Sequence, residues 1–79
     1  MRDYKFALDR NARFEVGEEV VLHPYLDSAD HEDFKAHEGL EPGKKYQVNK
    51  AEIVDGYQQI TINNGNTDVV LISGWFARA

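Results

Sequence analysis

The sequence predicts a small all-β fold, an antiparallel barrel of five or six short strands that forms one domain over residues 1–79. Apolar residues alternate with polar ones in short runs, which is the period of a strand with one buried face. Turn-forming residues separate these runs at short intervals, as in barrels and sandwiches. Closure into a barrel removes the unpaired edges that a short open sheet would expose.

The most regular strand pattern begins just after the middle of the chain. Tyr46 and Val48 alternate with polar residues, and residues 45–54 are rich in types that suit a half-buried strand. The dipeptide Asp55-Gly56 follows and can adopt the positive φ angles of a tight hairpin turn. A strand and a hairpin turn are therefore predicted over residues 45–56.

The hairpin pattern continues to the end of the chain. Ile60 and Ile62 alternate with polar residues and predict the antiparallel partner strand. Asn64-Gly65 is a strong hairpin signal, and the apolar run 69–72 predicts a third strand that is buried on both faces. These strands form a three-stranded meander, which residues 73–76 close.

The first half of the chain predicts one clear strand. Residues 16–18 form a turn that leads into a strand over residues 19–23, and Pro24 ends the ladder because it lacks a backbone donor. Residues 1–13 are interpreted as an amino-terminal arm or an extra strand, because apolar and polar residues alternate there at Tyr4, Phe6 and Leu8.

A long acidic loop separates the two parts of the barrel. Between residues 26 and 40 the alternation disappears. Ser28 or Asp30 is a suitable cap for one or two helical turns that end near Lys35, and Gly39 is placed to stop them. We therefore expect a loop with one short helix.

Several turn glycines and core positions combine into a longer pattern. It consists of Phe14-x-Val16-Gly17-x-x-Val20, Gly39-Leu40-x-x-Gly43-Lys44-x-Tyr46-x-Val48, an Asn-Gly turn between two strands, and a closing Trp75-Phe76. Over residues 14–76 this pattern resembles the small SH3-like β-barrel proteins of bacteria and their phages. The resemblance implies an SH3-like fold and a non-catalytic protein-binding module, such as a phage or prophage modulator of a host protein.

The charge is unevenly distributed. Residues 15–43 hold nine acidic residues and one lysine, whereas the segments before and after them are slightly basic, and the chain as a whole carries a net charge of -5. An acidic surface favours a protein partner with a basic surface. The predicted contacts are carboxylates for charge complementarity and aromatic rings for apolar anchoring: Asp30, Glu32, Asp33 and Glu38, with Tyr25, Phe34 and Trp75.

Nucleic-acid binding by an SH3-like barrel is the alternative hypothesis. Phosphate binding needs clustered basic side chains. The candidates are few and dispersed, and the pI near 5.0 argues against them. They are Arg10, Arg13, Lys44, Lys45 and Lys50.

Other function classes have little support in the residues. The chain has no cysteine, which favours a reducing, cytoplasmic location. Its serines, Ser28 and Ser73, do not lie in a nucleophile motif, and the spacing of His31 and His37 fits no common zinc motif. We expect no enzymatic activity, metal, cofactor or membrane span, and either a monomer or a weak homodimer.

Overall fold

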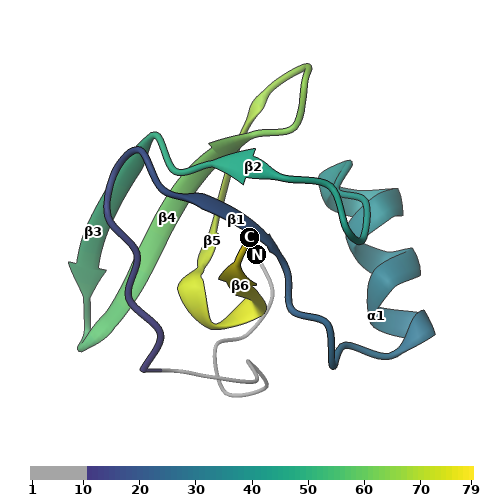
Figure 1. Ribbon diagram of the computed structural model, residues 1–79, viewed down its shortest axis with the longest axis horizontal. Coiled ribbons are helices and arrows are strands. Elements are labelled where there is room, and N and C mark those ends of the chain that lie inside the picture. The colour runs from purple at the N-terminus through teal and green to yellow at the C-terminus, as the bar shows by residue number, and fades with distance from the viewer. Residues whose placement is uncertain (1–10) are drawn as a thin grey trace.

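The computed structural model describes residues 11–79 and is mostly β-structure (Figure 1). Its strands form two antiparallel three-stranded sheets, ordered β2-β1-β6 and β3-β4-β5. The elements in chain order are β1 (Glu19–Leu22), α1 (Ser28–Asp33), a π-helix (Phe34–Glu38), β2 (Tyr46–Gln47), β3 (Lys50–Val54), β4 (Tyr57–Asn63), β5 (Asp68–Ile72), a 3-10 turn (Ser73–Trp75) and β6 (Phe76–Arg78).

The predicted meander is confirmed as the sheet β3-β4-β5. Val54 pairs with Tyr57 across a two-residue turn, in which Asp55 and Gly56 have φ angles of 53° and 82°. These are the angles of the mirror-image turns that match strand twist. The second hairpin is wider than a two-residue Asn-Gly turn, because Asn63 pairs with Asp68 across a four-residue loop.

The strand predicted over residues 45–54 is divided between the two sheets. Val48 exchanges hydrogen bonds with the segment before β1, since Gly17 N–H donates to Val48 O and Val48 N–H donates to Glu18 O. The next residue turns to the other sheet, where Asn49 N–H donates to Thr61 O at 2.8 Å. The all-β class is confirmed, but no closed barrel is found among residues 11–79, because the ladder divides here.

One hydrophobic core joins both sheets and the helical segment. Every strand except β3 contributes buried side chains to it, among them Val20 and Leu22 from β1 and Ile60 and Ile62 from β4. Strand β5 has only one consistently buried face, since Val70 is 46% exposed. The prediction that residues 69–72 are buried on both faces was therefore wrong at Val70.

The acidic loop is more ordered than the sequence predicts. Asp27, not Ser28 or Asp30, caps helix α1, and its carboxylate accepts the Asp30 N–H at 2.8 Å. The helical path continues as a π-helix and ends at Gly39, whose φ of 68° is left-handed, as expected for a C-terminal glycine. Burial of Phe34 in the core explains why the helix continues to that point.

The first described residues cross the β3-β4-β5 sheet without forming a strand. Ser73 Oγ donates to Ala12 O at 2.6 Å, and the guanidinium of Arg13 donates to Gly56 O at 2.9 Å. The extra strand suggested by Tyr4, Phe6 and Leu8 lies outside the described residues.

Candidate protein-binding surface

The most exposed aromatic side chain of the described chain stands at the start of the acidic segment. Tyr25 is 84% exposed, yet its position is constrained. Its ring lies against that of His23, with centroids 5.3 Å apart and planes tilted by 41°. Its backbone N–H donates to His23 Nδ1 at 3.2 Å. Because Nδ1 accepts this bond, the neutral imidazole carries its proton on Nε2.

A proline turn accounts for the exposure of Tyr25. Leu26 N–H donates to His23 O at 3.1 Å, which closes a four-residue turn with Pro24 at the second position, where its fixed φ is suited. Tyr25 occupies the third position and points away from the core. His23 N–H donates to Trp75 O at 2.9 Å, so the turn is attached to the body of the protein.

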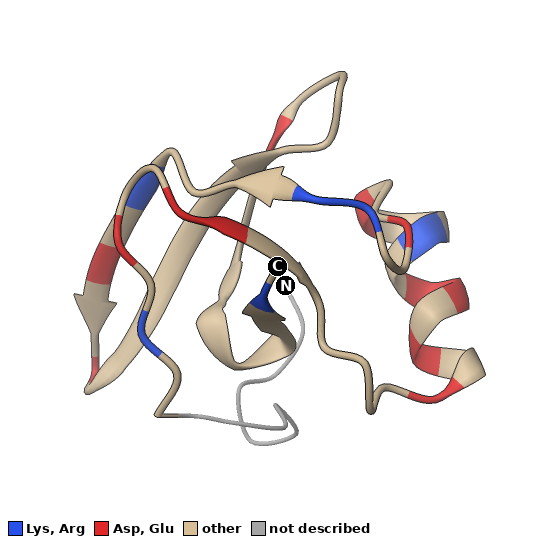
Figure 2. Cartoon of the chain, in the orientation of Figure 1, with Lys and Arg blue, Asp and Glu red and all other residues tan. Residues whose placement is uncertain are grey.

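The acidic side chains follow directly after this turn. Figure 2 shows acidic residues along α1 and the loop before it, and Lys35 follows in the π-helix. Asp27, Glu32 and Asp33 are exposed, whereas Asp30 and Glu38 are half-buried. The structure therefore brings Tyr25 and three exposed carboxylates together on one short segment.

Phe34 and Trp75, which the sequence suggests as apolar contacts for a partner, lie in the core. Their relative exposures are 0% and 1%, and their rings meet edge to face with centroids 5.5 Å apart. Together they fix the helical segment to the 3-10 turn. Of the three aromatic residues proposed as contacts, Tyr25 alone is accessible to an outside molecule.

A shallow pocket of about 290 Å³ lies between the helical segment and the loop that follows it, and it shares Glu32 with the acidic side chains above. Its helical wall has the spacing of one helix face, and Pro42 from the following loop forms the opposite wall. Nδ1 of His31 is buried and has no hydrogen-bond partner. The helical spacing was visible in the sequence, but the approach of Pro42 was not. The lining residues are Ser28, His31, Glu32, Lys35 and Pro42.

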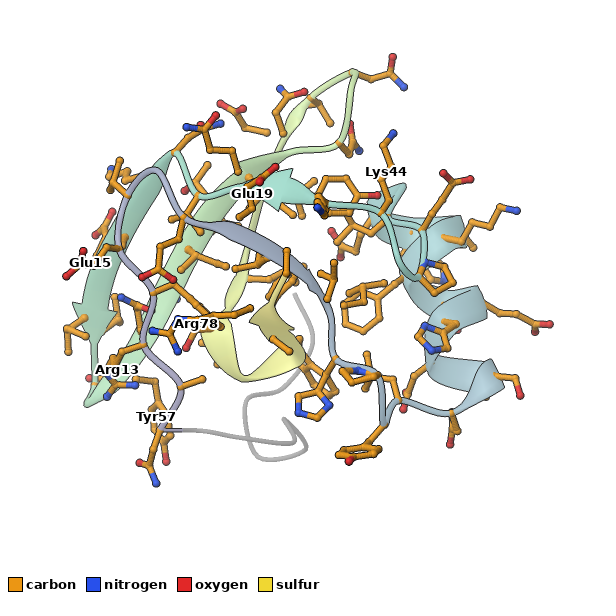
Figure 3. All side chains as sticks on the ribbon, in the orientation of Figure 1. Arg13, Glu15, Glu19, Lys44, Tyr57 and Arg78 are labelled. Atoms are coloured by element: carbon orange, nitrogen blue, oxygen red, sulfur yellow. The ribbon has the colours of Figure 1, made fainter. Side chains whose placement is uncertain are left out.

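The basic residues of the nucleic-acid hypothesis do not gather into one patch. Figure 3 shows Arg13 at the lower left and Lys44 at the upper right, well separated in this view. Lys44 Nζ lies 5.7 Å from the ring centre of Tyr46, and Lys50 forms an ion pair with Glu52 at 2.9 Å. Arg10 lies outside the described residues.

Residues 11–79 contain no group of three or more histidine or acidic side chains placed to hold a metal ion. None of their helices is long and apolar enough to span a membrane. Comparisons with protein-family models, with curated proteins and with solved structures found no match to the chain.

Proposed function

We propose that this protein is a non-catalytic binding module that docks onto a basic protein surface through Tyr25 and the carboxylates of residues 27–38. The observation that carries the proposal is the exposure of Tyr25, an aromatic ring that is held in place by His23 and yet left in water. Exposed aromatic residues commonly provide much of the binding energy at protein interfaces. Glu32 and Asp33, which are exposed on the segment that follows, supply complementary charge.

The arrangement of strands supports an SH3-like architecture for this module. The path from β2 to β3 bends at residues 48–49 and contributes to both sheets, and a 3-10 turn carries the chain from β5 back to β6. Both transitions let two small sheets share one core. On the resemblance alone, the proposal extends to a phage or prophage modulator of a host protein.

The two parts of the surface have different roles in binding. The carboxylates increase the rate of encounter with a basic partner, and salt screens this effect over about 8–10 Å. Tyr25 then provides apolar contact and a ring face for a lysine or arginine of the partner. Because His23 already orders the ring, binding costs less side-chain entropy than it would for a free tyrosine.

The test compares variants of the two parts in affinity capture from host extract, followed by binding kinetics with the captured protein. Tyr25→Ala should abolish capture while the melting temperature stays unchanged. The double variant Glu32→Gln, Asp33→Asn should slow association and weaken its salt dependence, because other carboxylates of residues 27–38 keep their charge. The matched control Glu19→Gln, Asp68→Asn neutralises two exposed carboxylates elsewhere and should bind normally.

Equal capture by the wild type and Tyr25→Ala would contradict the proposal. A parallel titration with duplex DNA, single-stranded DNA and RNA at low salt tests the alternative. Binding there that is lost on changing Lys44 and Lys45 to Gln would replace protein docking with phosphate binding.

A further inference from the structure

The loop between β4 and β5 contains a chemically reactive dipeptide in a fully hydrogen-bonded setting. In Asn64-Gly65 the side-chain oxygen of Asn64 accepts the N–H groups of Asn66 and Thr67, both at 2.9 Å. Its Nδ2 donates to Glu38 O at 2.8 Å. The backbone N–H of Gly65 donates to Asn63 Oδ1 at 2.8 Å.

The same side chain fastens the loop to the end of the acidic helical segment. Glu38 is the last residue of the π-helix, and its carbonyl is one of the groups left without an intrahelical partner at a helix end. Asn64 satisfies that carbonyl. The Asn64 side chain also lies close to Gly39, since a Cβ added at Gly39 would be 2.7 Å from Asn64 Nδ2.

We propose that Asn64 is a deamidation site that the native fold keeps closed. In the reaction the Gly65 backbone nitrogen gives its proton to solvent and attacks Asn64 Cγ. The Cγ–Nδ2 bond then breaks, and the amide nitrogen takes up a proton from solvent and leaves as ammonia, with a succinimide in place. Water then opens the ring to aspartate or isoaspartate. Glycine permits this attack because it places no side chain beside the nitrogen.

The native contacts oppose the attack that forms the succinimide. The attacking Gly65 nitrogen is engaged with Asn63, and the side chain of Asn64 is held by three hydrogen bonds that fix its rotamer. Attack requires these bonds to open, so the rate follows the population of the locally opened loop. The unfolded chain has no such protection.

The product would no longer fit its site. An aspartate at position 64 lacks the Nδ2 donor and sets a carboxylate against the Glu38 carbonyl, at the helix end where negative charge is unfavourable. Isoaspartate also lengthens the backbone by one carbon within the four-residue loop. Deamidation therefore detaches the acidic segment from the β4–β5 loop.

The experiment follows deamidation of the full chain at mildly alkaline pH by intact mass and by peptide mapping for isoaspartate. Samples are kept folded in buffer or unfolded in guanidinium chloride. Modification of Asn64 should be at least about tenfold slower in the folded sample. Equal rates, or faster reaction in the folded protein, would overturn the proposal.

Two variants test separately whether the change at Asn64 weakens the attachment of the acidic segment to the β4–β5 loop. Asn64→Asp reproduces one product and should lower the melting temperature, whereas Asn66→Asp adds the same charge to the same loop at an exposed side chain and should have little effect. If Asn64→Asp does not fold at all, this result also agrees with the expected loss of stability. Equal melting temperatures for both variants and the wild type would contradict the proposed role of Asn64.

Discussion

The side-chain amide of Gln58 forms two hydrogen bonds with the backbone of Phe14. Phe14 N–H donates to Gln58 Oε1, and Gln58 Nε2 donates to Phe14 O, both at 2.8 Å. A neighbouring strand would satisfy the same two backbone groups in the same way. Gln58 thus fastens the amino-terminal segment to β4 through a buried side chain, and it leaves neither polar group of Phe14 unsatisfied.

Replacing Gln58 with leucine should destabilise the protein by about 2–4 kcal/mol, because it leaves a buried N–H and a buried C=O without partners. Gln58→Glu keeps the shape but sets an oxygen against Phe14 O. Protonation of the introduced carboxyl restores a donor, so burial should raise its pKa in the folded state. The loss of unfolding free energy caused by Gln58→Glu should therefore become smaller as the pH falls.

Chemical unfolding of the wild type and both variants between pH 4 and pH 7 measures these effects. Gln58→Leu serves as the control. Leucine does not titrate, so the loss of unfolding free energy in this variant should not change with pH through a carboxyl group at position 58. If the loss of unfolding free energy in Gln58→Glu is the same at pH 4 and at pH 7, the hydrogen bond donated by the Gln58 amide does not contribute to stability.

The sequence predicted those features that depend on adjacent residues. The Asp55-Gly56 turn needs only two positive φ angles in succession, and the alternation along residues 59–63 identifies one face of a strand. Both are confirmed. The helix end at Gly39 was predicted for the same reason, because a left-handed glycine is a local property.

Contacts between distant residues were not predictable from local patterns. Gln58 and Phe14 are 44 positions apart, and nothing in the polar spacing of β4 shows that one glutamine faces inward. The burial of Phe34 against Trp75 likewise depends on how the loop folds back. Local signals therefore identified Tyr25, beside Pro24, as an exposed ring, but they could not show that Phe34 and Trp75 lie in the core.

Phe34→Ala should destabilise the protein by about 3–5 kcal/mol, since it removes a fully buried ring and leaves a cavity beside Trp75. A core of this size supplies only about 3–5 kcal/mol in total, so this variant should be largely unfolded at 25 °C. Tyr25→Ala, at an exposed site, should change stability by less than about 0.5 kcal/mol. Circular dichroism and thermal melting distinguish the two outcomes, and a folded Phe34→Ala protein would argue against the observed packing.

Gly39→Ala should be more destabilising than Gly43→Ala, although both glycines have a positive φ. Their φ angles of 68° and 80° impose similar backbone strain on alanine. A Cβ at Gly39 also meets Asn64, whereas a Cβ at Gly43 has no atom within 4 Å. The difference in unfolding free energy between the two variants isolates the contact with Asn64. Equal values would show that backbone strain alone accounts for the loss of stability in both.

The Lys50–Glu52 pair on β3 should give a small stability change confined to alkaline pH. The hydrogen bond and charge of Glu52 raise the pKa of Lys50 above its ordinary value of 10.5, with desolvation opposing them. A lysine whose pKa is raised in the folded state stabilises the fold below its unfolded pKa, and that contribution is lost as the pH rises through the folded value. Both side chains are at least half exposed, so added salt should weaken the effect.

An NMR titration of the Lys50 side chain should show its pKa falling toward 10.5 in Glu52→Gln, and not in Glu32→Gln on α1. An unchanged Lys50 titration in Glu52→Gln would rule out the pair as the cause.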